Sequence, residues 1–260
     1  PSFNKDSSFA SLIDSIENKN NNKKIVKLIP NWAYSAAAIL VVAFGVLFFM
    51  SNSTTQFKTG FGEQLAITLP DNSTVNLNAN SSLKFKTKDW EANRTLELSG
   101  EAFFDVEKGS KFKVISKEGA VEVLGTEFNV VSRDNYFEIK CYEGKVNVSN
   151  DKNKSLALLT LGKAIRVNES KIENWTFIEA KPNWTQGESS FNNTPLKEVI
   201  KALENQYKVK FNTTLINLDR RFTGSFTHED INIALKTVFG SMEIQYSKSN
   251  NNIIILKDKK

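Results

Sequence analysis

The feature that most constrains this sequence is a run of nineteen residues without a charge, from Trp32 to Met50. At a rise of about 1.5 Å per residue, a helix of this length matches the ~30 Å hydrocarbon core of a bilayer. Trp32 and Tyr34 stand where interfacial aromatic residues are found. A core helix would show a polar face over this length, and a signal peptide would have a shorter apolar core followed by small residues at a cleavage site. We therefore expect a transmembrane helix at residues 32–50.

The charges that flank this run predict its orientation. Four lysines precede it, Lys19, Lys23, Lys24 and Lys27, whereas Lys58 is the only basic residue that soon follows. The positive-inside rule then puts the N-terminus in the cytoplasm and residues 51–260 on the far side of the membrane. The single cysteine, Cys141, excludes an intrachain disulfide, and a region so poor in cysteine fits a bacterial periplasm. We expect a single-pass protein of the bacterial inner membrane.

The N-terminal residues 1–31 read as a cytoplasmic tail. The sequence begins at Pro1, without an initiator methionine, which favours a tail left from a longer cytoplasmic region. Phe9, Leu12, Ile13 and Ile16 have the spacing of one apolar helix face, and Ser7 or Ser8 can cap such a helix. An isolated helix this short is marginal in water, so we expect it to fold with a partner or as part of a larger domain.

Residues 51–185 predict a mainly-β antiparallel domain. Apolar and polar residues alternate in segments such as Leu65-Ala66-Ile67 and Phe137-Glu138-Ile139, and turn signals such as Glu143-Gly144 separate them. The spacing of eight to twelve residues is typical of a sandwich, a barrel or a β-helix, with no room for helices. Weaker strand signals at 156–161 and 164–167 precede a connector.

Residues 186–260 predict a small α+β domain of two βαβ repeats. A helix opens at Thr194-Pro195 and a strand follows it, and the same layout recurs at an offset of 35 residues. Seven pairs of apolar positions share this offset: Phe191/Phe226, Leu196/Ile231, Val199/Ala234, Ile200/Leu235, Leu203/Val238, Val209/Ile244 and Phe211/Tyr246. Two such units can place two helices on one face of a small sheet whose free edges suit strand addition.

The sequence offers little for catalysis. His228 is the only histidine and reads as a residue near the start of a helix, and with one cysteine no zinc site or Cys/His pair can form. The chain has no phosphate-binding loop, no dinucleotide motif and no nucleophile elbow. The net charge of +5 comes from scattered lysines, which argues against a nucleic-acid partner. We expect neither an enzyme nor a cofactor.

Four motifs in the β domain resemble those of FecR-type transmembrane anti-sigma regulators. They are LAITLPDNSTVNLNANSSLKF at 65–85, LSGEAFFDV at 98–106, VLGTEFNV at 123–130 and EGKV at 143–146. The repeated module resembles the C-terminal domain of such regulators in Bacteroidetes, which is similar in turn to the signalling domain of secretins and TonB-dependent receptors. Asn72 stands where the family has Gly, and Leu161-Gly162-Lys163 where it has Pro-Gly-Gln.

The resemblance implies a signalling role with two protein partners. Outside the inner membrane, the partner would be the signalling domain of a TonB-dependent outer-membrane receptor. In the cytoplasm, it would be an extracytoplasmic-function sigma factor, bound through the family's N-terminal helical domain, which this sequence lacks.

Two other readings were weighed. A membrane-anchored glycan-binding or structural β protein would need an aromatic platform, to which Trp90, Trp175 and Trp184 would contribute. Some relatives of the family cut themselves at a Gly-Thr bond, and Gly125-Thr126 lies in the matching motif. The threonine hydroxyl would attack the preceding carbonyl in an N-to-O acyl shift. We favour a structural role for this glycine, a bulge between two strands, because no general base is evident nearby.

Overall fold

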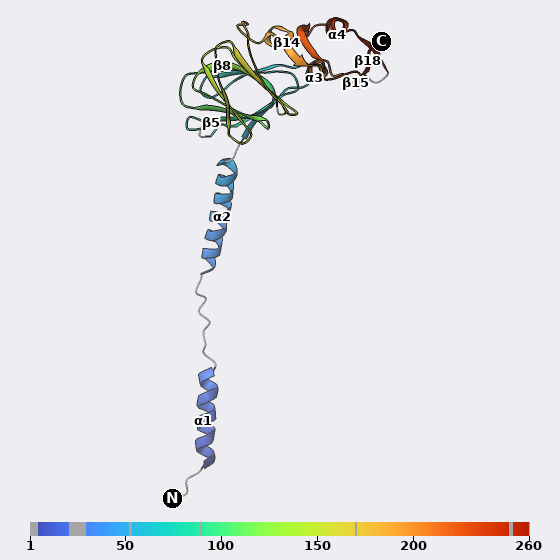
Figure 1. Ribbon diagram of the computed structural model, residues 1–260. Coiled ribbons are helices and arrows are strands. Elements are labelled where there is room, and N and C mark those ends of the chain that lie inside the picture. Colours follow the sequence, from blue (N-terminus) through green and yellow to red (C-terminus); the bar gives the residue numbers. More distant parts are fainter. Residues whose placement is uncertain are drawn as a thin grey trace. The chain divides into compact units, whose positions relative to one another are not determined.

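The computed structural model describes residues 5–20, 30–51, 54–88, 90–169, 171–249 and 252–259. The chain forms two compact units, Pro1–Ser51 and Asn52–Lys260. Figure 1 labels the main helices and strands along the chain.

The first unit is helical. Helix α1 spans Lys5–Asn20 and helix α2 spans Asn31–Ser51. Helix α1 begins before Ser7 and Ser8, so the expectation that one of them caps it is wrong. Its apolar positions Phe9, Leu12 and Ile16 are exposed. Over the residues that the structure describes, no helix combines the length and apolarity needed to cross a membrane, so the span at 32–50 stays a prediction.

The mainly-β domain expected at 51–185 is one curled sheet of thirteen strands. The strands are β1 Thr54–Lys58, β2 Leu65–Thr68, β3 Thr74–Leu77, β4 Ser82–Lys86, β5 Arg94–Val106, β6 Phe112–Ile115, β7 Gly119–Val123, β8 Thr126–Arg133, β9 Tyr136–Cys141, β10 Lys145–Asn150, β11 Ser155–Thr160, β12 Lys163–Asn168 and β13 Lys171–Thr176. Strand β13 lies in the segment that was expected to be a connector. Its residues are exposed or half-buried and give no clear apolar alternation, which is why the sequence did not predict a strand here.

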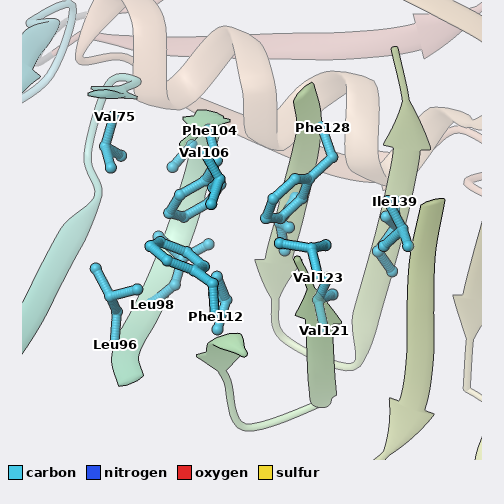
Figure 2. Packing of buried hydrophobic residues seen from close by; sticks show 14 of the residues in the cluster. Val75, Leu96, Leu98, Phe104, Val106, Phe112, Val121, Val123, Phe128 and Ile139 are labelled. Atoms are coloured by element: carbon cyan, nitrogen blue, oxygen red, sulfur yellow. The ribbon is translucent and has the colours of Figure 1, made fainter. Parts of the chain in front are cut away.

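The sheet folds into two layers that face one another. Layer A has the order β1-β4-β5-β6-β7-β10-β11, and layer B the order β2-β3-β5-β8-β9-β12-β13. The inward side chains of both layers form one apolar core, in which Phe104 stacks on Phe128 and packs edge-on against Phe112 (Figure 2). The domain is therefore sandwich-like, one of the architectures expected from the spacing of the strands.

Strand β5 joins the layers because it belongs to both. Its first half pairs with β4 and β6, and its second half, from Gly100 on, pairs with β3 and β8. Gly100 has a φ of 111°, and a Cβ there would lie 2.3 Å from Ser81 Oγ. Only glycine fits this bend. Ser99-Gly100 has the composition of a turn but lies inside a strand.

One strand pair departs from the antiparallel expectation. Strands β5 and β6 run parallel, while the other pairs of this domain are antiparallel. The loop between them contains Lys108, Gly109 and Ser110 and returns the chain to the start of β5. The paired segments are 94–97 and 112–115, so the second half of β5 is part of the long crossover that a parallel pair needs. The turn signal in this loop is the same as that of a hairpin, so it did not reveal the parallel pairing.

The C-terminal part holds the two expected strand–helix–strand units. After a 3-10 turn, η1 at Asn183–Gln186, the first unit is β14 Glu188–Pro195, α3 Leu196–Tyr207 and β15 Lys210–Leu215, and the second is β16 Arg221–Thr227, α4 Ile231–Ser241 and β17 Ile244–Lys248, followed by β18 Ile253–Asp258. Residues 188–259 are called the repeat module below.

The repeat module has two small sheets in place of the single sheet expected. Strands β14 and β16 pair antiparallel in one, and the other has the order β15-β18-β17. Because β18 is parallel to β15 and antiparallel to β17, the second strands of the two units also run in opposite directions. The first strands of the two units, β14 and β16, and the second strands, β15 and β17, thus both run in opposite directions, as expected for two units related by a two-fold rotation. Helices α3 and α4 bury Val199, Leu203, Leu235 and Val238 in a common core, at the positions that the offset of 35 predicts.

Candidate functional site

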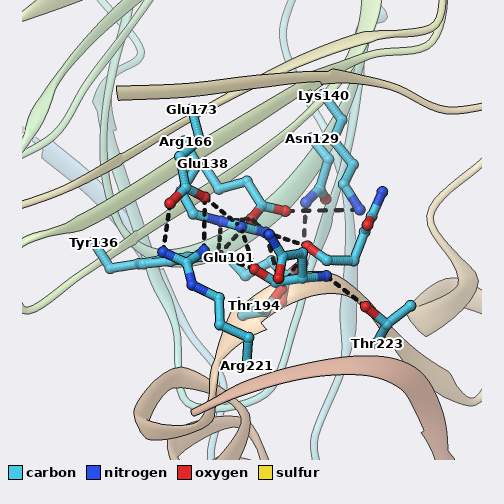
Figure 3. Close-up of polar contacts among 12 residues, drawn as sticks. Glu101, Asn129, Tyr136, Glu138, Lys140, Arg166, Glu173, Thr194, Arg221 and Thr223 are labelled. Carbon is cyan, nitrogen blue, oxygen red and sulfur yellow. Dashed lines mark hydrogen bonds and ion pairs between the residues drawn. The ribbon is translucent and has the colours of Figure 1, made fainter. Parts of the chain in front are cut away.

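The outer face of layer B carries a row of side chains that runs across five neighbouring strands, and four of the five side chains are charged. The strand register places Glu101 opposite Val131, Val131 opposite Glu138, Glu138 opposite Arg166, and Arg166 opposite Glu173. In an ordinary sandwich such a face would be solvated. Here the repeat module covers it, and the row becomes the junction between the two parts of the unit (Figure 3).

Arg166 is the centre of this junction and is 1% exposed. Its Nε donates to the Tyr136 hydroxyl and to Glu138 Oε2, both at 2.9 Å, and its Nη1 donates to Glu173 Oε2 at 3.0 Å. The guanidinium lies over the Trp175 ring, 4.6 Å from its centroid. These contacts, all within layer B, fix the plane and direction of the side chain.

The remaining donors of Arg166 reach strand β14 of the repeat module. Nη1 donates to the backbone oxygen of Asn193 at 3.0 Å, and Nη2 donates to the backbone oxygen of Asn192 at 3.0 Å and to Thr194 Oγ1 at 2.9 Å. A buried guanidinium must have its donors satisfied, because each one left without an acceptor costs its desolvation energy. Arg166 therefore needs both parts of the unit in place.

A second arginine makes the same connection from the other side. Arg221, on β16, donates to Glu173 Oε2 at 2.9 Å and to the backbone oxygen of Asn193 at 2.8 Å. Glu173 is thus shared by one arginine of each part. The hydrogen bond from Arg221 is the main cause that lowers the pKa of Glu173, with Arg166 adding to it.

Further along the row, a buried carboxylate is held by amides. Asn78 Nδ2 and Asn129 Nδ2 donate to the two oxygens of Glu101, at 2.8 and 3.0 Å. Asn129 Oδ1 in turn accepts from Trp184 Nε1 at 3.1 Å, which ties the η1 turn to layer B. Burial raises the pKa of Glu101 in spite of these bonds. Burial acts on Glu138 in the same direction, but Lys140 and Arg166 outweigh it and leave the pKa of Glu138 below its usual value.

The repeat module and the η1 turn also bind segment 59–64, which follows β1. The Gly62 N–H donates to the backbone oxygen of Asn205, near the C-terminal end of α3, at 3.0 Å. Asn80 Nδ2 donates to Asn205 Oδ1 at 2.8 Å, and Gln64 Nε2 donates to the Trp184 backbone oxygen at 3.0 Å. Gly62 has a φ of 69°, and a Cβ there would lie 2.8 Å from the Gln206 backbone oxygen. The close approach requires glycine at this position.

Between these contacts lies a cavity of about 100 Å³, lined by polar groups that include Glu101, Tyr142, Glu198 and Lys201. It has room for several water molecules, and its lining offers them partners. Burial raises the pKa of Glu198, against the effect of Lys201. The junction thus encloses a cavity lined by polar groups, with Trp184 in its wall.

The residues singled out for self-cleavage lie where β7 connects to β8. Gly125 packs against Lys108, whose Cγ would lie 2.6 Å from a Cβ at this position. Thr126 is 4% exposed, and its hydroxyl donates to the Lys145 backbone oxygen at 3.2 Å. The proton of that hydroxyl is therefore directed at a carbonyl, which is no base.

The other residues weighed for chemistry are scattered. Trp90 lies in the apolar core, Trp175 lies under Arg166, and Trp184 is buried at the junction, so they form no shared platform. His228 accepts or donates a bond with Ser189 Oγ at 2.9 Å, and Asp230 caps α4. Cys141 is buried, and burial raises the pKa of its thiol to about 11. Among the described residues, no cluster of His, Cys, Asp and Glu can hold a metal ion.

Apart from Trp175 and Trp184, which were considered only for an aromatic platform, the junction residues were not singled out from the sequence. Glu138 and Arg166 each stand between apolar residues in an alternating strand, which is also the pattern of a solvated face. The only signal in the sequence for an ion pair was their opposite charges, on two strands that are neighbours in the structure. The sequence does not show which strands are neighbours, or that a second domain covers this face.

Comparisons with known proteins agree with this architecture. The family described as FecR protein matches residues 55–147, and the one described as FecR, C-terminal, matches residues 188–255. Two crystal structures of a candidate anti-sigma factor from Parabacteroides distasonis are similar, both at 28% identity. Their TM-scores are 0.72 and 0.73, and the matches cover 79% and 80% of this chain and all of theirs. No curated protein matches.

Replacing Arg166 by leucine should destabilise residues 52–260 by about 3–5 kcal/mol, because Glu138 and Thr194 would stay buried without their donor. The free energy of unfolding in denaturant measures this. The matched control is Lys210→Met, which removes an exposed ion pair with Glu204 and should cost at most about 1 kcal/mol. Equal effects of the two changes would contradict the role given to Arg166.

Residues 52–260 should remain one intact chain on storage, since the Thr126 hydroxyl has no base to activate it. Mass spectrometry of the purified wild type and of Thr126→Ala should give a single mass for each. Two fragments from the wild type that sum to the whole chain, absent in the variant, would show that the Gly125-Thr126 bond is cut.

Proposed function

The chain belongs to the FecR family of anti-sigma factors, which are regulators rather than enzymes, and from this we propose that it relays a signal across the bacterial inner membrane. Residues 1–31 lie in the cytoplasm, residues 32–50 span the membrane, and residues 51–260 lie in the periplasm. Three observations support this topology: residues 32–50 carry no charge, α2 is helical, and lysines precede it.

On the cytoplasmic side, the partner is a sigma factor of the extracytoplasmic-function class. The anti-sigma family supports a sigma factor as partner in general. Helix α1 presents Phe9, Leu12, Ile13 and Ile16 to solvent, four apolar residues at the spacing of one face. Such a face is buried when a helix docks into a groove of another protein. The tail 1–31 then continues the sigma-binding region of the family.

On the periplasmic side, the partner is the signalling domain of a TonB-dependent outer-membrane receptor, and the repeat module receives it. The sheet β15-β18-β17 ends in two strands that each have one free edge, which suits pairing with a strand of the partner. The outward side chains at its centre include Ile253, which is exposed. The resemblance of the repeat module to such signalling domains supports contact between like sheets.

The observation that carries the relay is the grip of the repeat module on segment 59–64. Strand β1 ends at Lys58, directly before this segment, and begins three residues after the end of α2. Gly62 and Gln64 are bound by α3 and η1. A displacement of the repeat module is thus passed to the strand that follows α2 in the sequence, without crossing the core between the layers. Among the described strands β1 pairs only with β4, so it can shift at low cost.

A glycan-binding or structural β protein is the alternative. Its aromatic platform has no support in the positions of Trp90 and Trp184, which are buried apart from each other. The relay explains the buried contacts between the two parts of the unit, whereas a passive anchor would not need them.

The topology is tested with reporters fused after Lys260. An enzyme that is active only in the periplasm should be active there, and one that is active only in the cytoplasm should be silent. The opposite pattern would place residues 51–260 in the cytoplasm and end this proposal.

The relay is tested by Gly62→Val in the full-length protein. The added side chain would strike the Gln206 carbonyl and break the contact with α3, so the response of a sigma-dependent reporter to the inducer should be lost. The receptor's signalling domain should still bind residues 52–260 in calorimetry. The two parts are kept together because Arg166 loses three acceptors when they are separated.

The matched control is Gly162→Val, which has the same backbone strain. Gly162 has a φ of 72° and approaches the Phe177 carbonyl, away from α3. Both changes should cost about 1–3 kcal/mol of stability. A normal response from Gly62→Val, or an equal loss from both variants, would show that the signal does not pass through segment 59–64.

A further inference from the structure

The outer face of layer A differs in charge from the face that the repeat module covers. The strand register puts Lys58 of β1 and Lys84 and Lys86 of β4 on this face, beside one another. Lys113 of β6 and Lys145 of β10 share it, and Lys111 lies two residues before Lys113 on the same side. The acidic side chains of these strands on this face are Glu97 and Glu122. Six lysines thus stand against two glutamates.

Half of these lysines have no ion-pair partner among the described residues. Glu97 pairs with Lys84 at 3.5 Å, and Glu122 pairs with Lys111 and Lys113 at 3.1 and 3.2 Å. That leaves Lys58, Lys86 and Lys145, which are all exposed. Two large apolar side chains lie among the lysines, Ile115 at 38% and Leu158 at 62% exposure. Exposed lysines around apolar side chains are typical of surfaces that meet lipid headgroups.

The length of the chain limits how far this face can be from the end of α2. Strand β1, at the edge of layer A, begins at Thr54, three residues after Ser51. At about 3.3–3.6 Å for each extended residue, this connection spans about 10 Å. The field of charged headgroups reaches a similar distance, about 8–10 Å, at physiological salt. If α2 spans the membrane, β1 starts within that field.

We propose that the outer face of layer A binds the anionic headgroups of the membrane in which α2 is anchored. The proposal rests on the proposed topology. The lysines bind lipid phosphates, and Ile115 and Leu158 meet the upper part of the acyl region. The tether gives this face a high local concentration of lipid, so each contact can be weak. The repeat module, on the outer face of layer B, then faces away from the inner membrane, where a receptor of the outer membrane can reach it.

The test uses residues 52–260, a compact unit whose share of the chain is close to what the crystallised P. distasonis structures cover. The probe is sedimentation with vesicles of phosphatidylcholine alone, or of phosphatidylcholine and phosphatidylglycerol in equal parts. Binding to the anionic vesicles should be observed at low salt and fall as salt is added, and the neutral vesicles should bind little.

Neutralising the three unpaired lysines in one variant, Lys58→Ser, Lys86→Ser and Lys145→Ser, should weaken binding about a hundredfold. The matched control removes as many exposed charges from the repeat module: Lys197→Ser, Lys236→Ser and Lys257→Ser. It should bind like the wild type, and thermal melting should show both variants folded.

No binding by the wild type, equal binding to neutral vesicles, or equal weakening in both variants would overturn the proposal. The first of these results would leave an acidic protein as the partner of this face. The fragment lacks α2, so its binding to vesicles does not depend on the proposed topology. An error in the topology is detected separately, by the reporters fused after Lys260.

Discussion

A single buried guanidinium decides how the parts of this protein are joined. Arg166 cannot remain in the junction unless its donors meet acceptors, and those acceptors come from two parts of the chain: Glu138 and Glu173 from layer B, and the backbone of Asn192 and Asn193 from β14. Replacing such a network by apolar residues can be neutral, but removing one partner is costly. The arrangement therefore favours one specific orientation of the repeat module, which a nonspecific hydrophobic contact would not do.

This fixed orientation gives the two faces of the curled sheet different roles. The acidic and amide side chains of layer B hold the repeat module and the η1 turn, and Asn205 of the repeat module and Trp184 of η1 in turn bind segment 59–64. The lysines of layer A remain uncovered by the described residues of the chain. In the proposed relay, a signal received at the repeat module has a short route to β1, and layer A is the face that we propose to rest on the membrane.

The sequence allowed much of this fold to be predicted, and the reasons for the gaps are physical. The alternation along the strands and the offset of 35 residues reflect local burial, so they identified the β domain and both strand–helix–strand units. The parallel pair of β5 and β6 and the bend at Gly100 depend on which strands become neighbours, which no local pattern records. Glu138 and Arg166 look like solvated residues for the same reason. Gly125 and Thr126, chosen from a motif, proved to be closely packed, and the Thr126 hydroxyl donates to the Lys145 backbone oxygen.

The central claim is that the repeat module and layer B open and close together. Amide hydrogen exchange of residues 52–260, measured under native conditions, tests this most directly. The most protected amides of β12 and those of β14 should exchange with the same free energy of opening, equal to that of global unfolding. If the amides of β14, α3 and α4 open at a free energy several kcal/mol below that of β12, the repeat module is an independent domain, and the role of Arg166 in joining the two parts is contradicted.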